Sequence, residues 1–153
     1  MSPRRLSLAV AALSVIGAAI AGYLTWVHVA ELQPYCVGGG GACERVQSSP
    51  YAKLAGVPVA AIGLAGYLAV LASLLLRDRS VTAFLALVGA GFSAYLTYLE
   101  LAVIDAICQW CVASAVVMTA LAVAAVARMY ESIVRQTPDE AAAAGGHTRR
   151  HVA

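Results

Sequence analysis

Four cysteines in two closely spaced pairs are the residues best suited to chemistry. Cys36 and Cys43 are separated by six residues, of which four are consecutive glycines, and Cys108 and Cys111 form a CxxC motif. Paired thiols can close into disulfides, exchange them with other thiols, or bind a metal. Glycine loses more freedom on ordering than any other residue. The glycine run therefore favours a first pair that moves between partners over a simple loop staple.

Four apolar segments must position these cysteines. Residues 6–27, 57–76, 81–99 and 107–127 contain no charged side chain, and each reaches roughly 30 Å as a helix, enough to cross a bilayer. The chain is 61% hydrophobic and only 12% charged, which excludes an ordinary soluble domain. We therefore predict an all-α integral membrane protein, a four-transmembrane-helix bundle over residues 1–128 with a long outer loop at 28–56. Residues 129–153 are expected to form a disordered cytoplasmic tail.

Positive charges predict the orientation. Eight of the ten basic residues flank the apolar segments on one side, and only Arg45 and Lys53 fall on the other. By the positive-inside rule both termini are cytoplasmic, and all four cysteines face the extracytoplasmic side of a bacterial cell membrane. That side is oxidising, so disulfides can form there. The first segment also resembles a cleavable signal peptide, although its apolar run is longer than the usual signal.

The CxxC motif opens the last apolar segment. Cys108 and Cys111 then share one face of the first helical turn, where the helix dipole stabilises a thiolate. Apolar surroundings act in the opposite direction, and the balance stays open. Two inert disulfides or a zinc site with four thiolates are alternatives. A transporter or assembly subunit with structural disulfides is another, although proton-coupled transporters usually need a carboxylate inside an apolar segment, and these four segments have none.

A wider set of motifs resembles a known family. It comprises the spaced pair in a long outer loop, "CERVQSSPYAKLAGVP" after its second cysteine, and "CQWC" at the start of the last helix. Together, over about residues 8–127, they resemble the bacterial vitamin K epoxide reductase family. The resemblance implies a four-helix bundle around a quinone pocket. It also implies an enzyme that passes electrons from a thioredoxin-fold protein to quinone, so that the partner can oxidise secreted proteins.

The same resemblance assigns a role to each candidate site residue. Cys36 exchanges with the partner's thiol, and Cys43 then attacks the Cys108–Cys111 disulfide through a mixed disulfide with Cys108. Cys111 is freed beside the quinone and reduces it. Ser49 corresponds to the family's loop serine, with a quinone-binding or loop-stabilising role. In "SSP" it is equally typical of a helix cap or turn.

Departures from the family pattern narrow the expected activity. Vertebrate members have a tyrosine four residues after the second CxxC cysteine, where this chain has Ala115, and the chain contains no asparagine. Quinone reduction, with menaquinone or ubiquinone, is thus expected rather than epoxide reduction, and no metal is expected. The DsbB family shares the thiol-to-quinone chemistry, but its two cysteine pairs occur in the reverse order, which favours the vitamin K epoxide reductase family.

Two further features concern partners and protons. No thioredoxin domain follows before Ala153, so we expect a separate DsbA-like thioredoxin-fold oxidase as partner, and no nucleic acid. Quinone reduction consumes two protons. Glu100 and Asp105, in the short link "ELAVIDA", most simply mark the outer surface, and either is an alternative candidate to relay one of these protons.

Overall fold

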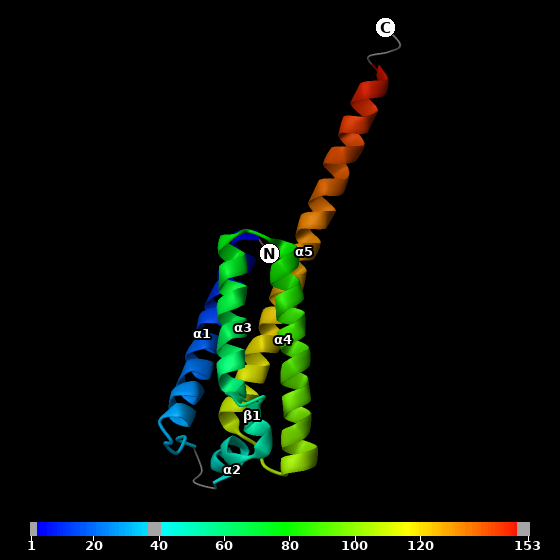
Figure 1. Ribbon diagram of the computed structural model, residues 1–153. Coiled ribbons are helices and arrows are strands. Elements are labelled where there is room, and N and C mark those ends of the chain that lie inside the picture. Colours follow the sequence, from blue (N-terminus) through cyan, green and yellow to red (C-terminus); the bar gives the residue numbers. More distant parts are fainter. Residues whose placement is uncertain (1–2, 37–40, 150–153) are drawn as a thin grey trace.

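In residues 3–36 and 41–149, which the computed structural model describes, four long helices pack side by side (Figure 1). They are α1 (Pro3–Val29), α3 (Val59–Leu75), α4 (Arg79–Leu99) and α5 (Gln109–Arg149). Helix α1 packs against α3 and α5, and α4 packs against α5 and α3. The short α2 lies at one end of the bundle, and α5 extends beyond the other end (Figure 1).

Length and composition make this an all-α, multi-pass membrane protein. Three helical segments are long and apolar enough to cross a membrane, namely Arg4–Val29, Arg79–Ile104 and Gln109–Arg135. Helix α3 is apolar but shorter, with 17 residues. It is shorter than the predicted segment 57–76 because Val57 and Pro58 belong to a hairpin instead of the helix.

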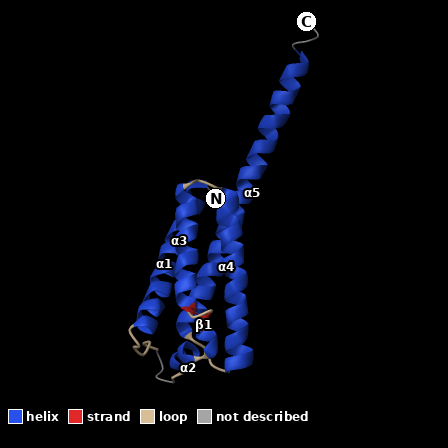
Figure 2. Cartoon of the chain, viewed as in Figure 1, coloured by secondary structure: helices blue, strands red, loops and turns tan. Residues whose placement is uncertain are grey.

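The segment between α1 and α3 is more ordered than the predicted loop at 28–56. It contains α2 (Ala42–Ser48), the 3₁₀ turn η1 (Pro50–Ala52), β1 (Lys53–Leu54) and β2 (Val57–Pro58) (Figure 2). The strands are antiparallel, with Lys53 opposite Pro58 and Leu54 opposite Val57. The two turn residues, Ala55 and Gly56, both have positive φ (51° and 84°), as a two-residue hairpin requires. Of the glycine run at 38–41, only Gly41 is described, directly before α2 with φ of 63°, and the rest of that prediction falls outside the described residues.

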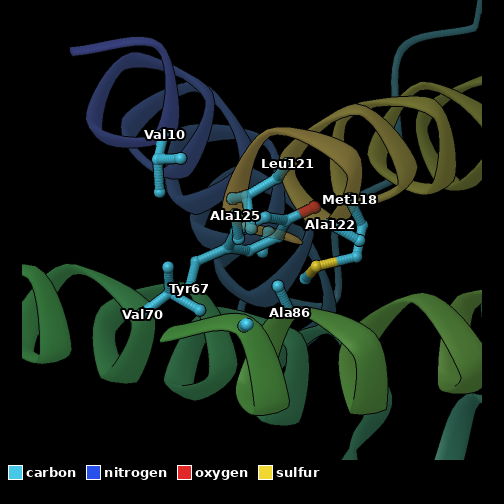
Figure 3. Close-up of a cluster of buried hydrophobic side chains, with 10 residues drawn as sticks. Val10, Tyr67, Val70, Ala86, Met118, Leu121, Ala122 and Ala125 are labelled. Carbon is cyan, nitrogen blue, oxygen red and sulfur yellow. The ribbon is translucent and has the colours of Figure 1, made fainter. Parts of the chain in front are cut away.

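Small and branched side chains fill the centre of the bundle (Figure 3). Tyr67 of α3 is 1% exposed, and its hydroxyl donates to the carbonyl oxygen of Ser114 on α5 at 3.0 Å. Between α3 and α4, the hydroxyls of Ser73 and Thr82 lie 2.8 Å apart. These interhelical hydrogen bonds pair polar atoms for which lipid and apolar side chains offer no hydrogen-bonding partner.

Helix α5 differs from the expectation for the tail. The sequence allowed some helix near Met129 and predicted disorder beyond it, and in the structure the helix continues through Arg149. Alanine has the highest helix propensity, and the alanine run at 141–144 favours continuation. Residues 150–153 lie outside the described part of the chain.

Candidate active site

A sharp change of direction between α4 and α5 places the CxxC motif. Helix α4 ends in the π-helical turn η2 (Glu100–Ile104), and Asp105 then takes a left-handed conformation with φ of 52°. Aspartate tolerates this conformation better than most residues. The amide of Ala106 donates to the carbonyl of Glu100 at 3.2 Å, which closes the turn. The chain thereby reaches Cys108, directly before the first residue of α5, as the sequence analysis expected for the motif.

Cys108 and Cys111 occupy different environments on the first turn of α5. Cys108 is the N-cap residue, since its carbonyl accepts the amide of Val112 at 3.0 Å, and its side chain is fully buried. Cys111 is only partly buried, and both residues carry free thiols. A hydrogen bond from the Cys111 thiol lowers the pKa of Cys108, and desolvation by burial opposes this only in part. At Cys108 the hydrogen bond therefore outweighs burial, and its pKa lies below that of an ordinary thiol.

The second cysteine pair lies directly beside the first. Cys36 and Cys43 form a disulfide with a Cα–Cα distance of 6.4 Å. Cys43, on α2, is 3% exposed and belongs to one buried cluster with Cys108, Val46 and Ala106. Cys36 and Cys111 pack against this cluster. The structure therefore brings together all four cysteines that the sequence singled out.

Hydrogen bonds hold the segment before Cys36 to the CxxC turn. The indole N–H of Trp110 donates to the carbonyl oxygen of Tyr35 at 2.8 Å, and the amide of Tyr35 donates to the hydroxyl of Tyr23 at 3.1 Å. The rings of Tyr23 and Trp110 lie 5.0 Å apart at a tilt of 51°. Residues from α1, the loop and α5 thus fix the segment that ends at Cys36 beside the CxxC turn. Sequence reasoning missed this role because the three residues share no local motif.

An apolar pocket of about 370 Å³ opens beside Cys111. Its walls come from α1, α3, α4, α5 and the segment that contains α2 and η1. Apolar side chains such as Leu85, Phe92 and Leu96 dominate the lining, and Cys111 and Glu100 are among its few polar groups. The volume and the sparse polar groups are typical of a site for a small organic molecule.

Glu100 is a buried carboxylate in contact with both thiol residues of α5. Its side chain is 4% exposed, and its Oε2 accepts the amide of Cys108 at 3.0 Å. The Cys111 thiol also lies close to this carboxylate. Asp105, the other carboxylate that the sequence proposed for a proton relay, is exposed. The predicted segment 81–99 contains no carboxylate, but the apolar helical segment in the structure, Arg79–Ile104, is longer and includes Glu100.

Ser49 lies where α2 meets the pocket. Its hydroxyl donates to the carbonyl oxygen of Val46 at 2.8 Å, which closes the last turn of α2, and the residue also lines the pocket. Both parts of the role expected for Ser49, loop stabilisation and a place beside the ligand, are compatible with this position.

The fold and site define a helical membrane protein with two adjoining cysteine pairs beside an apolar pocket. Within the described residues no three His, Cys, Asp or Glu side chains are grouped so that they could hold a metal ion. The model of the Vitamin K epoxide reductase family matches residues 8–126. Since this covers most of the chain, the protein belongs to that family, whose members are redox enzymes.

Proposed function

We propose that the protein is a thiol:quinone oxidoreductase that reoxidises a separate DsbA-like thioredoxin-fold partner and so supports disulfide formation in secreted proteins. One observation carries this proposal. Cys108 is buried in a cluster with Cys43, the proposed electron donor, whereas Cys111 lines the pocket, the proposed site for the electron acceptor. The arginine distribution favours an extracytoplasmic position for this site.

Electrons move in three balanced exchanges. First, the partner's two thiols reduce the Cys36–Cys43 disulfide, and the partner leaves with a disulfide of its own. Next, the Cys43 thiolate attacks Cys108 in the Cys108–Cys111 disulfide, and Cys36 resolves the resulting mixed disulfide. This regenerates the Cys36–Cys43 bond and leaves thiols at Cys108 and Cys111, which is the state seen in the structure. Finally, Cys108 and Cys111 close into a disulfide again as they give up two electrons and two protons.

The pocket suits a quinone ring. The apolar walls fit a lipid-soluble ring and the start of its tail, and the Cys111 thiol lies on the same wall as the Glu100 carboxylate. A bound quinone, menaquinone or ubiquinone, supplies the acceptor chemistry by taking up two electrons and two protons. Ser49 at the pocket edge holds the end of α2 in place and adds a polar group to the lining.

Glu100 transfers one of the two protons. In this proposal its carboxylate accepts the Cys111 proton as the new disulfide forms, and then releases it into the pocket. The amide of Cys108 holds the carboxylate in position from the other side. These contacts connect Glu100 with the thiols, so its burial in a helical segment supports the redox function rather than proton-coupled transport.

Single replacements of Cys108 and Cys111 by serine test the function. Protein in membranes or detergent is supplied with a reduced thioredoxin-fold partner and with quinone, and loss of quinone absorbance is followed. We expect both variants to be inactive, because either change removes one half of the dithiol. The Cys36→Ser variant is the matched control, and with dithiothreitol as direct reductant it should still reduce quinone. Full activity in either Cys108→Ser or Cys111→Ser would exclude the proposal.

A further inference from the structure

A second pocket lies at the end of the bundle opposite the cysteines. It measures about 470 Å³ and is lined by four arginines: Arg4 of α1, Arg77 and Arg79 at the α3–α4 turn, and Arg128 of α5. In Figure 1 the α3–α4 turn and the point where α5 leaves the bundle lie at the end away from α2. The cysteine chemistry uses none of these residues, and the positive-inside rule requires only that such charges flank the helices.

Arg128 is what makes this pocket a built site. Its side chain is only 8% exposed, and within the described part of the chain its Nη1 is buried without a hydrogen-bond partner. A buried guanidinium group with an unmet donor is costly unless an acceptor is supplied. The positive charge of Arg79 repels that of Arg128, and a bound anion would offset this repulsion.

No acidic side chain among the described lining residues supplies an acceptor for Arg128. Asp78 lies between Arg77 and Arg79 in sequence, but its carboxylate caps α4 by accepting the amides of Ser80 and Val81, each at 3.0 Å. The described residues that line the pocket include no aspartate or glutamate. Four positive charges therefore line one space, from α1, α5, the α3–α4 turn and the start of α4, and the described lining residues include no carboxylate.

We infer that this pocket binds a phosphate-bearing anion, and that the headgroup of an anionic membrane phospholipid is its source. Guanidinium groups offer paired donors that match phosphate oxygens. Basic pockets between transmembrane helices at the membrane surface are suited to such headgroups. Leu74 and Ala11 add apolar side chains to the same lining, which suits the start of an acyl chain beside the headgroup.

Thermal unfolding of the purified full chain in detergent tests the inference. The probes are short-chain phosphatidylglycerol, short-chain phosphatidylcholine and inorganic phosphate. We expect phosphatidylglycerol to raise the Tm of the wild type, because a ligand of the folded state stabilises it. In Arg79→Gln the half-saturating lipid concentration should rise about fivefold, the effect of removing one surface arginine. Arg128→Gln should lose most of the response.

The control is Arg135→Gln, since Arg135 is an exposed arginine on the same helix that does not line the pocket. It should respond like the wild type. If Arg128→Gln does not fold, Arg77→Gln and Arg79→Gln carry the test, because both side chains are exposed. Inorganic phosphate that raises Tm equally would support the anion site but overturn the lipid as its source. Equal responses to phosphatidylcholine, or no difference between Arg79→Gln and Arg135→Gln, would overturn the site itself.

Discussion

Replacing Glu100 by glutamine removes a proton acceptor while it preserves most of the local geometry. The carboxylate accepts the amide of Cys108 at 3.0 Å and contacts the Cys111 thiol. The glutamine oxygen can still accept the amide, but it cannot take up a proton from the thiol. Positioned general bases contribute roughly 10²- to 10⁴-fold to a rate. We therefore expect quinone reduction to slow by at least about 100-fold, or about 2.7 kcal/mol in the barrier.

The assay separates this step from thiol exchange. The protein is reduced, freed of reductant and mixed with quinone without oxygen, and the first turnover is followed by quinone absorbance. Asp105→Asn is the matched control, because Asp105 is an exposed carboxylate in the same link and should have no effect on the rate. Exchange between a reduced partner and the Cys36–Cys43 disulfide should also be unchanged in Glu100→Gln. A first-turnover rate within twofold of wild type, alongside an inactive Cys111→Ser, would refute the proton role of Glu100 and leave the thiol relay intact.

Two further substitutions test the end of α2 and the bundle. Ser49→Ala removes the hydrogen bond to the Val46 carbonyl that closes α2, so the free energy of unfolding should fall by about 1 kcal/mol. The exposed neighbour Ser48→Ala should have a smaller effect because its hydrogen bond to the Arg45 carbonyl is longer, at 3.4 Å, and equal losses in the two variants would contradict this role. Gly17→Ala places a Cβ against the buried ring of Tyr67 and should destabilise the bundle by about 1–3 kcal/mol in thermal or denaturant unfolding. Gly22→Ala is the control, because nothing lies within 4 Å of the added carbon on the same helix, and it should not destabilise the bundle. Equal stability of the two variants would show that the close approach between Gly17 and Tyr67 is absent.

Features set by neighbouring residues could be predicted from the sequence. A charge-free run fixes a helix almost by itself, so the segment predicted at 6–27 agrees with α1, Pro3–Val29, within a few residues. The CxxC motif likewise falls at the start of a helix as its placement after a short link indicated. The match to the Vitamin K epoxide reductase family confirms the resemblance drawn from the cysteine spacing and its flanking motifs.

Features that depend on distant contacts could not be predicted. Helix α2 has only seven residues, too few to be stable alone, and its buried face of Cys43 and Val46 exists because Cys108 packs there. The Trp110–Tyr35 hydrogen bond joins residues 75 positions apart, and no local pattern signals it. Glu100 follows directly after an apolar run, which is typical of a surface residue, whereas in the structure it begins the π-helical turn and its carboxylate accepts the amide of Cys108.

The most direct test of the electron path is to map disulfides in Cys111→Ser protein that carries the Cys36–Cys43 disulfide and has received no reductant. Without Cys111, the Cys108 thiolate can attack only Cys43 of that disulfide, which releases Cys36 as a thiolate, and the Cys43–Cys108 mixed disulfide should accumulate. Mass spectrometry of peptides should then detect a Cys43–Cys108 link, which the shared buried cluster makes accessible. Recovery of Cys108 only as a free thiol, with Cys43 bonded to Cys36 alone, would contradict the electron path between the two pairs.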